Sequence, residues 1–107
     1  MGSRNEELPL AAEIEQTADQ LRIYNGLAKA MREPHVVLDV VLEAADAAAA
    51  RTGLRARFGL DEIQAMAVLD MQFRAATDRD RRMIEARRQE LHEHLEVLRE
   101  LDAGSAQ

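Results

Sequence analysis

The feature that most restricts how this 107-residue chain can fold is a row of side chains near its amino end, spaced alternately four and three residues apart. The spacing predicts one long helix from about Pro9 to Arg32, whose seam packs lengthwise on another helix. Pro9 suits the first position of a helix, and Gly26 permits close packing or a slight bend. The seam residues are Leu10, Ile14, Thr17, Leu21, Tyr24, Ala28 and Met31.

A second long helix at the carboxyl end supplies the partner for that seam. It is predicted from Thr77, which forms a variant capping box with Asp80, to about Asp102. Its apolar stripe consists of Ile84, Leu91, Leu95, Leu98 and Leu101. At 1.5 Å per residue each outer helix is roughly 35–40 Å long. We therefore expect the two helices to fold back on each other as an antiparallel coiled coil.

Shorter helices are predicted between the outer two. Pro34 ends the first helix and starts a second one that runs to about Ala50. Thr52 can cap a short third helix that ends at Gly59. Period-two alternation is absent from the sequence, so the expected fold class is all-α. The predicted domain is 9–102, with a stalk of 9–32 and 77–102, a small helical tip of 34–76, and flexible ends at 1–8 and 103–107.

The fourth predicted helix is apolar on nearly all sides. It begins at Asp61, whose side chain can accept hydrogen bonds from the first-turn amides while Gln64 reaches back. A helix that is apolar all round must be covered on more than one side, and a thin domain cannot do this with its own chain. We therefore expect one face to meet a second copy of the chain in a homodimer. The predicted interface residues are Ile63, Met66, Leu69, Asp70 and Phe73.

The segment Phe58–Met71, with Ile23–Met31 before it and Ala76-Thr77 after it, resembles part of the A subunit of bacterial DNA gyrase and topoisomerase IV. The resemblance is to the coiled-coil stalk and exit gate, and it covers roughly Thr17 to Leu101. The chain keeps several residues of the family pattern: Phe58, Leu60, Gln64, Ala65, Ala67, Leu69, Met71 and Thr77. Phe73 and Ala76 depart from the pattern, because the family has leucine at both positions.

The resemblance implies that the second to fourth helices form a dimer gate, which in the full enzyme closes behind the transported DNA segment. Nothing in the sequence resembles the DNA-cleaving, ATPase or DNA-wrapping domains of that family. The family cleaves DNA with a tyrosine in a winged-helix domain, whereas Tyr24 lies in the stalk seam, where packing is the expected role. We therefore expect no catalytic residue and no enzymatic activity.

Histidine and acidic residues near the carboxyl end do not have the spacing of a metal site. His92 and His94 are two residues apart, so on a helix they point about 200° apart and cannot share one ion. The spacing of the HExxH zinc motif is absent, and His35 lies far away in the sequence. The chain has no cysteine. We expect no metal and no cofactor.

The charge of the chain restricts its partners. The net charge is −6, which disfavours strong binding to duplex DNA because that binding depends on a surplus of Lys and Arg. The mixed run Asp78–Arg82 and the pair Arg87-Arg88 are expected to be solvated helix faces, with a phosphate contact as the alternative. No apolar run is long enough to span a bilayer, so no membrane association is expected. Together with the absence of cysteine, this favours the cytoplasm.

Three functions remain open from the sequence. The first is a gate-like homodimerisation module that also interacts with, or regulates, the A subunit of gyrase or topoisomerase IV. The second is a fragment or degenerate paralogue of a topoisomerase subunit with no independent role. The third is a small all-α enzyme of the chorismate-mutase type, which would need inward-facing basic residues around a pocket. Lys29 is the only lysine and the arginines show no such convergence.

Overall fold

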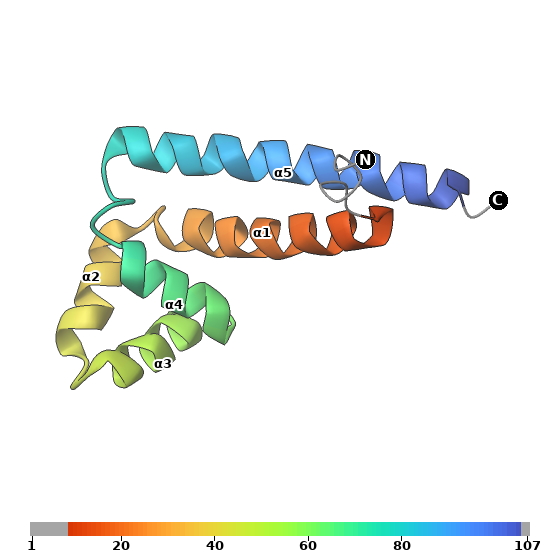
Figure 1. Ribbon diagram of the computed structural model, residues 1–107. Coiled ribbons are helices and arrows are strands. Elements are labelled where there is room, and N and C mark those ends of the chain that lie inside the picture. The colour runs from red at the N-terminus through yellow and green to blue at the C-terminus, as the bar shows by residue number, and fades with distance from the viewer. Residues whose placement is uncertain (1–8, 106–107) are drawn as a thin grey trace, which may run out of the picture.

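The computed structural model describes residues 9–105, which form five helices and no strand within that range (Figure 1). The helices are α1 (Leu10–Ala30), α2 (Pro34–Glu43), α3 (Ala47–Phe58), α4 (Glu62–Met71) and α5 (Asp78–Ser105). Helices α1 and α5 run antiparallel, and the three shorter helices gather at one end of this pair. The all-α prediction is confirmed, and the molecule is elongated, at 52 × 29 × 27 Å.

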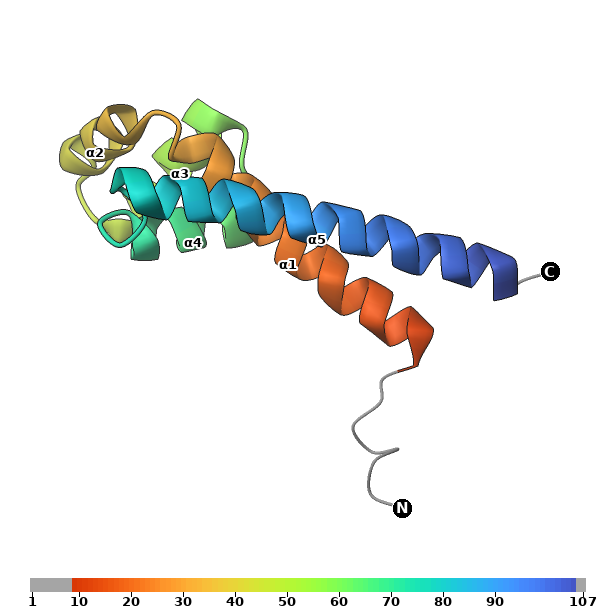
Figure 2. The ribbon, with the colours of Figure 1, turned by 90° about the horizontal axis from the view of Figure 1, so that it is seen from above.

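The stalk is held by the predicted seam. Leu21 of α1 packs with Leu91 and Leu95 of α5, and Ile14 and Ala18 pack against this cluster. Seen from above, α1 and α5 cross at a shallow angle and diverge toward their free ends (Figure 2). Leu101 on the predicted stripe is 56% exposed. Helix α5 has 28 residues and α1 has 21, so the last turns of α5 run past the start of α1.

A second, larger cluster joins the stalk to the tip. Its most deeply buried large side chains are Leu27 of α1, Met31 just after α1, Val37 of α2, Leu54 of α3 and Val68 of α4. Because every helix of the tip contributes to the same core as the end of α1, the tip packs on the stalk as one unit.

The predicted second helix, from Pro34 to Ala50, is wrong in its extent. Helix α2 ends at Glu43, and α3 begins after Asp46, whose carboxylate accepts a hydrogen bond from the Ala49 amide at 2.8 Å. The alanines around the break favour helix and so conceal it in the sequence. Thr52 is not a cap, because it lies inside α3 and donates its hydroxyl to the Ala48 carbonyl.

Other predicted boundaries agree more closely. Gly59 ends α3 in the left-handed conformation, with φ of 66°, as predicted. The Thr77 hydroxyl accepts a hydrogen bond from the Asp80 amide at 3.0 Å, at the start of α5. Helix α1 ends at Ala30, slightly before the predicted Arg32, and α5 continues to Ser105 instead of ending near Asp102. The predicted flexible segment 1–8 lies outside the described residues, as do 106 and 107.

Candidate functional site

Helix α4 lies between α1 and α3, with one face buried and another exposed (Figure 1). Ala65 and Val68 point into the core and are fully buried. Ile63 is 52% exposed and Met66 is 46% exposed, three residues apart on the outward side. Large apolar side chains that remain this accessible on a helix are candidates for contact with another molecule.

Polar contacts at its first turn fix α4 on the stalk. The Asp61 carboxylate accepts from the Gln64 amide at 2.8 Å, and the Gln64 carboxamide oxygen accepts from the Asp61 amide at 3.0 Å. This is the predicted capping box. The same residues also reach α1: Arg22 pairs with Asp61, and Gln64 Nε2 donates to the Arg22 carbonyl at 2.8 Å. The cap therefore also docks α4 on α1.

Gly26 allows this docking. A Cβ atom at this position would lie 2.7 Å from Cβ of Gln64 and 2.8 Å from its Cγ. No side chain larger than hydrogen fits there without movement, which confirms that Gly26 permits close packing.

Electrostatics at the cap favour the ionised carboxylate. The hydrogen bond from the Gln64 amide, followed by the contacts with Arg22, lowers the pKa of Asp61 against the opposing effect of desolvation. Glu62, the next residue, pairs with Arg51 at 2.9 Å and Arg55 at 3.1 Å, both on α3. Helix α4 is thus fixed to both neighbours through its first turn, while Ile63 and Met66 remain exposed on its outward side.

The predicted interface residues do not all have the same surroundings. Ile63, Met66 and Asp70 are exposed on α4. Phe73 is 76% exposed and lies in the turn after α4, not within the helix as predicted. Leu69 is half-buried and packs against the core of the tip.

Exposed leucines on α2 were not among the predicted interface residues. Leu42 is 71% exposed, and Leu38 lies beside Phe73 in a cavity of about 150 Å³ that His35 and Gln72 also line. The signal was present, since the run Val36–Leu42 is apolar on all sides except Asp39. We define the tip face as Leu38, Ile63, Met66, Asp70 and Phe73.

The other candidate residues lie in the stalk. Tyr24 is half-buried and packs against both clusters. His92 Nε2 lies 3.5 Å from Glu96 Oε2, and His94 Nε2 lies 3.5 Å from Glu13 Oε2. Within the described range 9–105, no group of three or more His, Cys, Asp or Glu residues is arranged to hold a metal ion. In the same range, no helix combines the length and apolarity needed to cross a bilayer.

The relatives found among known proteins are DNA gyrase A subunits. No protein-family model matches the chain. The DNA gyrase A subunit of Campylobacter fetus is 37% identical over 91 residues, which is 85% of this chain and 10% of that protein. The corresponding protein of Deinococcus deserti is 30% identical over 89 residues, 83% of this chain and 11% of the relative. That of a Nocardioides species is 44% identical over 63 residues, 59% of this chain and 6% of the relative.

The chain thus spans about a tenth of the length of the curated relatives that it matches over most of its residues. Most of this chain resembles one short region of the DNA gyrase A subunit.

Proposed function

We propose that this chain is a gate-like dimerisation module, in which two copies pair through the tip face. The observation that carries the proposal is the exposed stripe of α4, where Ile63 and Met66 stay accessible although the opposite side of the helix is fully buried. The sequence resembles the stalk and exit gate of the gyrase A subunit, and the resemblance implies that this region joins two subunits.

The energetics indicate how large the interface must be. Full burial of a large apolar side chain contributes about 1.5–3 kcal/mol, and Ile63 and Met66 are already about half covered. Association costs about 4–15 kcal/mol in lost freedom of motion. A stable dimer therefore also needs Phe73 and Leu38 of the tip face, so that the buried area approaches the roughly 1,200 Å² of a specific interface.

We further propose that the chain does not cleave DNA by itself. Cleavage needs a nucleophile activated within a site, and Tyr24 packs between the two clusters of the stalk and tip. The net charge of −6 also opposes tight binding to duplex DNA. Interaction with the A subunit of gyrase or topoisomerase IV, through the same tip face, is the regulatory form of this proposal.

The small share of each relative that is matched favours a second candidate. The chain would then be a fragment or degenerate paralogue of a topoisomerase subunit with no role of its own. The two candidates differ in what the isolated chain does, because only the first requires a stable dimer or a stable complex with the gyrase protein.

Charged substitutions test the proposal. Met66→Glu places a charge within the tip face, where burial without a partner costs several kcal/mol. We expect sedimentation equilibrium to report a monomer for Met66→Glu and a dimer for the unmodified chain. Val97→Glu is the control, since Val97 is 52% exposed on α5, outside the tip.

A dimer that persists in Met66→Glu, or that is lost equally in Val97→Glu, would contradict the assignment of the tip face. For the regulatory form, the chain is mixed with the purified A subunit of gyrase. If the chain associates only with itself and not with the A subunit, the regulatory form is rejected and the homodimer proposal stands.

A further inference from the structure

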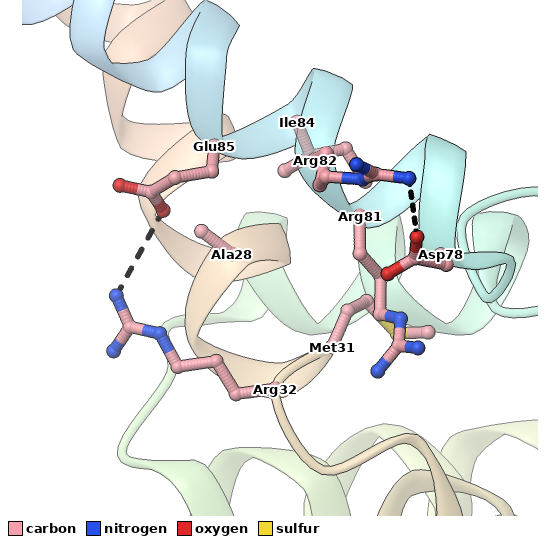
Figure 3. Close-up of a pocket in the computed structure, with 8 residues that line it drawn as sticks. All are labelled: Ala28, Met31, Arg32, Asp78, Arg81, Arg82, Ile84 and Glu85. Carbon is pink, nitrogen blue, oxygen red and sulfur yellow. Dashed lines mark ion pairs between the residues drawn. The ribbon is translucent and has the colours of Figure 1, made fainter.

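The junction of stalk and tip contains a cavity whose charges are incompletely paired. It has a volume of about 410 Å³ and lies between the end of α1 and the first turns of α5 (Figure 3). Its lining residues are Ala28, Met31, Arg32, Asp78, Arg81, Arg82, Ile84 and Glu85. Arg82 pairs with Asp78, and Arg32 reaches toward Glu85 at 3.9 Å.

Arg81 differs from the other two arginines of this cavity. Its side chain descends from α5 toward Met31 and carries no ion pair in Figure 3. Its Nε atom is buried and has no hydrogen-bond partner among residues 9–105. A guanidinium stays charged at any pH near neutral, and leaving one of its buried donors without an acceptor is unfavourable. The lining also includes three arginines and two carboxylates, so the cavity has donors in excess of acceptors.

Arg32 also lines this cavity, and Figure 3 shows its guanidinium on the Glu85 side of Met31, across from that of Arg81. Both Arg32 and Arg81 also line a neighbouring cavity of about 580 Å³, together with Glu33 and His35. The Arg32 side chain is 67% exposed, and its contact with Glu85 is long. Glu85 has a closer partner in Arg88, so Arg32 can turn away from it at little cost.

We propose that Arg81 and Arg32 form a binding site for a small phosphate-class oxyanion. The planar guanidinium offers parallel N–H donors that match two oxygens of such an anion. Asp78 and Glu85 do not exclude it, because Arg82 and Arg88 already hold these carboxylates. Each cavity is also far larger than the roughly 30 Å³ that one water molecule occupies in the liquid.

Such an anion would connect separate parts of the fold. Arg81 belongs to α5, whereas Arg32 lies in the turn between α1 and α2. A ligand that binds the folded chain and not the unfolded chain stabilises it in proportion to the logarithm of its concentration. Phosphate should therefore raise the unfolding temperature, whether the chain is a monomer or a dimer.

Calorimetric titration with inorganic phosphate, in chloride buffer at constant ionic strength, tests the site. We expect saturable binding of one phosphate per chain. Arg81→Met should weaken it by roughly tenfold or more, because charged hydrogen bonds are lost. Arg32→Gln should weaken it as well. Arg79→Gln is the matched control: it removes the same charge from the first turns of α5, and Arg79 lines neither cavity.

A second readout separates a ligand site from a structural role. Without phosphate, Arg81→Met should unfold at a higher temperature than the unmodified chain, because it keeps the apolar stem and removes the unpaired donors. Absence of saturable heat, an equal loss in Arg79→Gln, or a lower unfolding temperature for Arg81→Met would overturn the proposal. If Arg81→Met does not fold, the test rests on Arg32→Gln, because the Arg32 side chain is exposed. Unchanged phosphate affinity in Arg32→Gln then rejects the site.

Discussion

Gly26→Ala tests how closely the tip is fitted to the stalk. The added methyl carbon would lie 2.7 Å from Cβ of Gln64, a distance that non-bonded carbon atoms do not tolerate. Because Cβ is held by the backbone of α4, rotation of the Gln64 side chain cannot relieve the contact. Helix α4 must move away from α1, and the hydrogen bond from Gln64 Nε2 to the Arg22 carbonyl is then strained or lost.

The magnitude follows from opposing effects. Replacing glycine by alanine inside a helix is favourable by about 1 kcal/mol. Overpacking in a fitted contact costs about 1–3 kcal/mol, and a lost hydrogen bond costs about 0.5–1.5 kcal/mol more. We expect the unfavourable effects to exceed the helix propensity, with a net loss of about 1–3 kcal/mol in the free energy of unfolding.

Urea unfolding followed by circular dichroism, at one fixed protein concentration, measures this loss. Gly104→Ala is the matched control, since a Cβ built at that position of α5 meets nothing within 4 Å in the described part of the chain, apart from its own helix backbone and chain neighbours. The control should be as stable as the unmodified chain or slightly more so. If Gly26→Ala is equally or more stable, α1 and α4 are not fitted as the structure describes.

Further predictions concern the cap, the core and the tyrosine. The pKa of Asp61 is lowered in the folded state, by the Gln64 amide first and Arg22 next, so its stabilisation is complete above the ordinary pKa of 3.8 and is lost as the pH falls through the lowered value. The decline in stability on acidification should therefore be smaller in Asp61→Asn, and an identical acid decline in urea unfolding would contradict this. Leu27→Ala should cost about 2–5 kcal/mol, because Leu27 is 1% exposed at the centre of the larger cluster; a loss below about 1 kcal/mol would show that the site is loosely packed. Tyr24→Phe should fold with little change in melting, and neither it nor the unmodified chain should relax supercoiled DNA; a covalent DNA adduct formed only with Tyr24 would refute the non-catalytic proposal.

Local signals in the sequence predicted much of the fold. The four-and-three spacing identified the stalk, and the Asp61–Gln64 pair identified the start of α4, because both depend on residues close together in the chain. The break between α2 and α3 was missed because alanines surround it, and no local rule requires a helix to stop there. Nor does local spacing show that Gln64 reaches Arg22, since this contact joins residues 42 positions apart.

Exposure and pairing were also only partly predictable. The apolar character of α4 indicated a surface for a partner, but spacing alone did not separate the half-buried Leu69 from the exposed Met66. The run Asp78–Arg82 was expected to be a solvated helix face. Arg82 is exposed and pairs with Asp78, whereas Arg81 is partly buried and its Nε atom has no hydrogen-bond partner among residues 9–105. Which arginine of the run stays solvated depends on side-chain placement, which the sequence does not display.

Distances between spin labels on two copies of the chain test the central proposal most directly. The chain has no cysteine, so a single introduced cysteine carries one label per copy. Asp70→Cys places the label on the tip face, and Val97→Cys places it on the exposed side of the stalk. We predict a defined intermolecular distance at Asp70 that is shorter than the distance at Val97. Absence of any intermolecular distance, or a shorter distance at Val97, would contradict pairing through the tip.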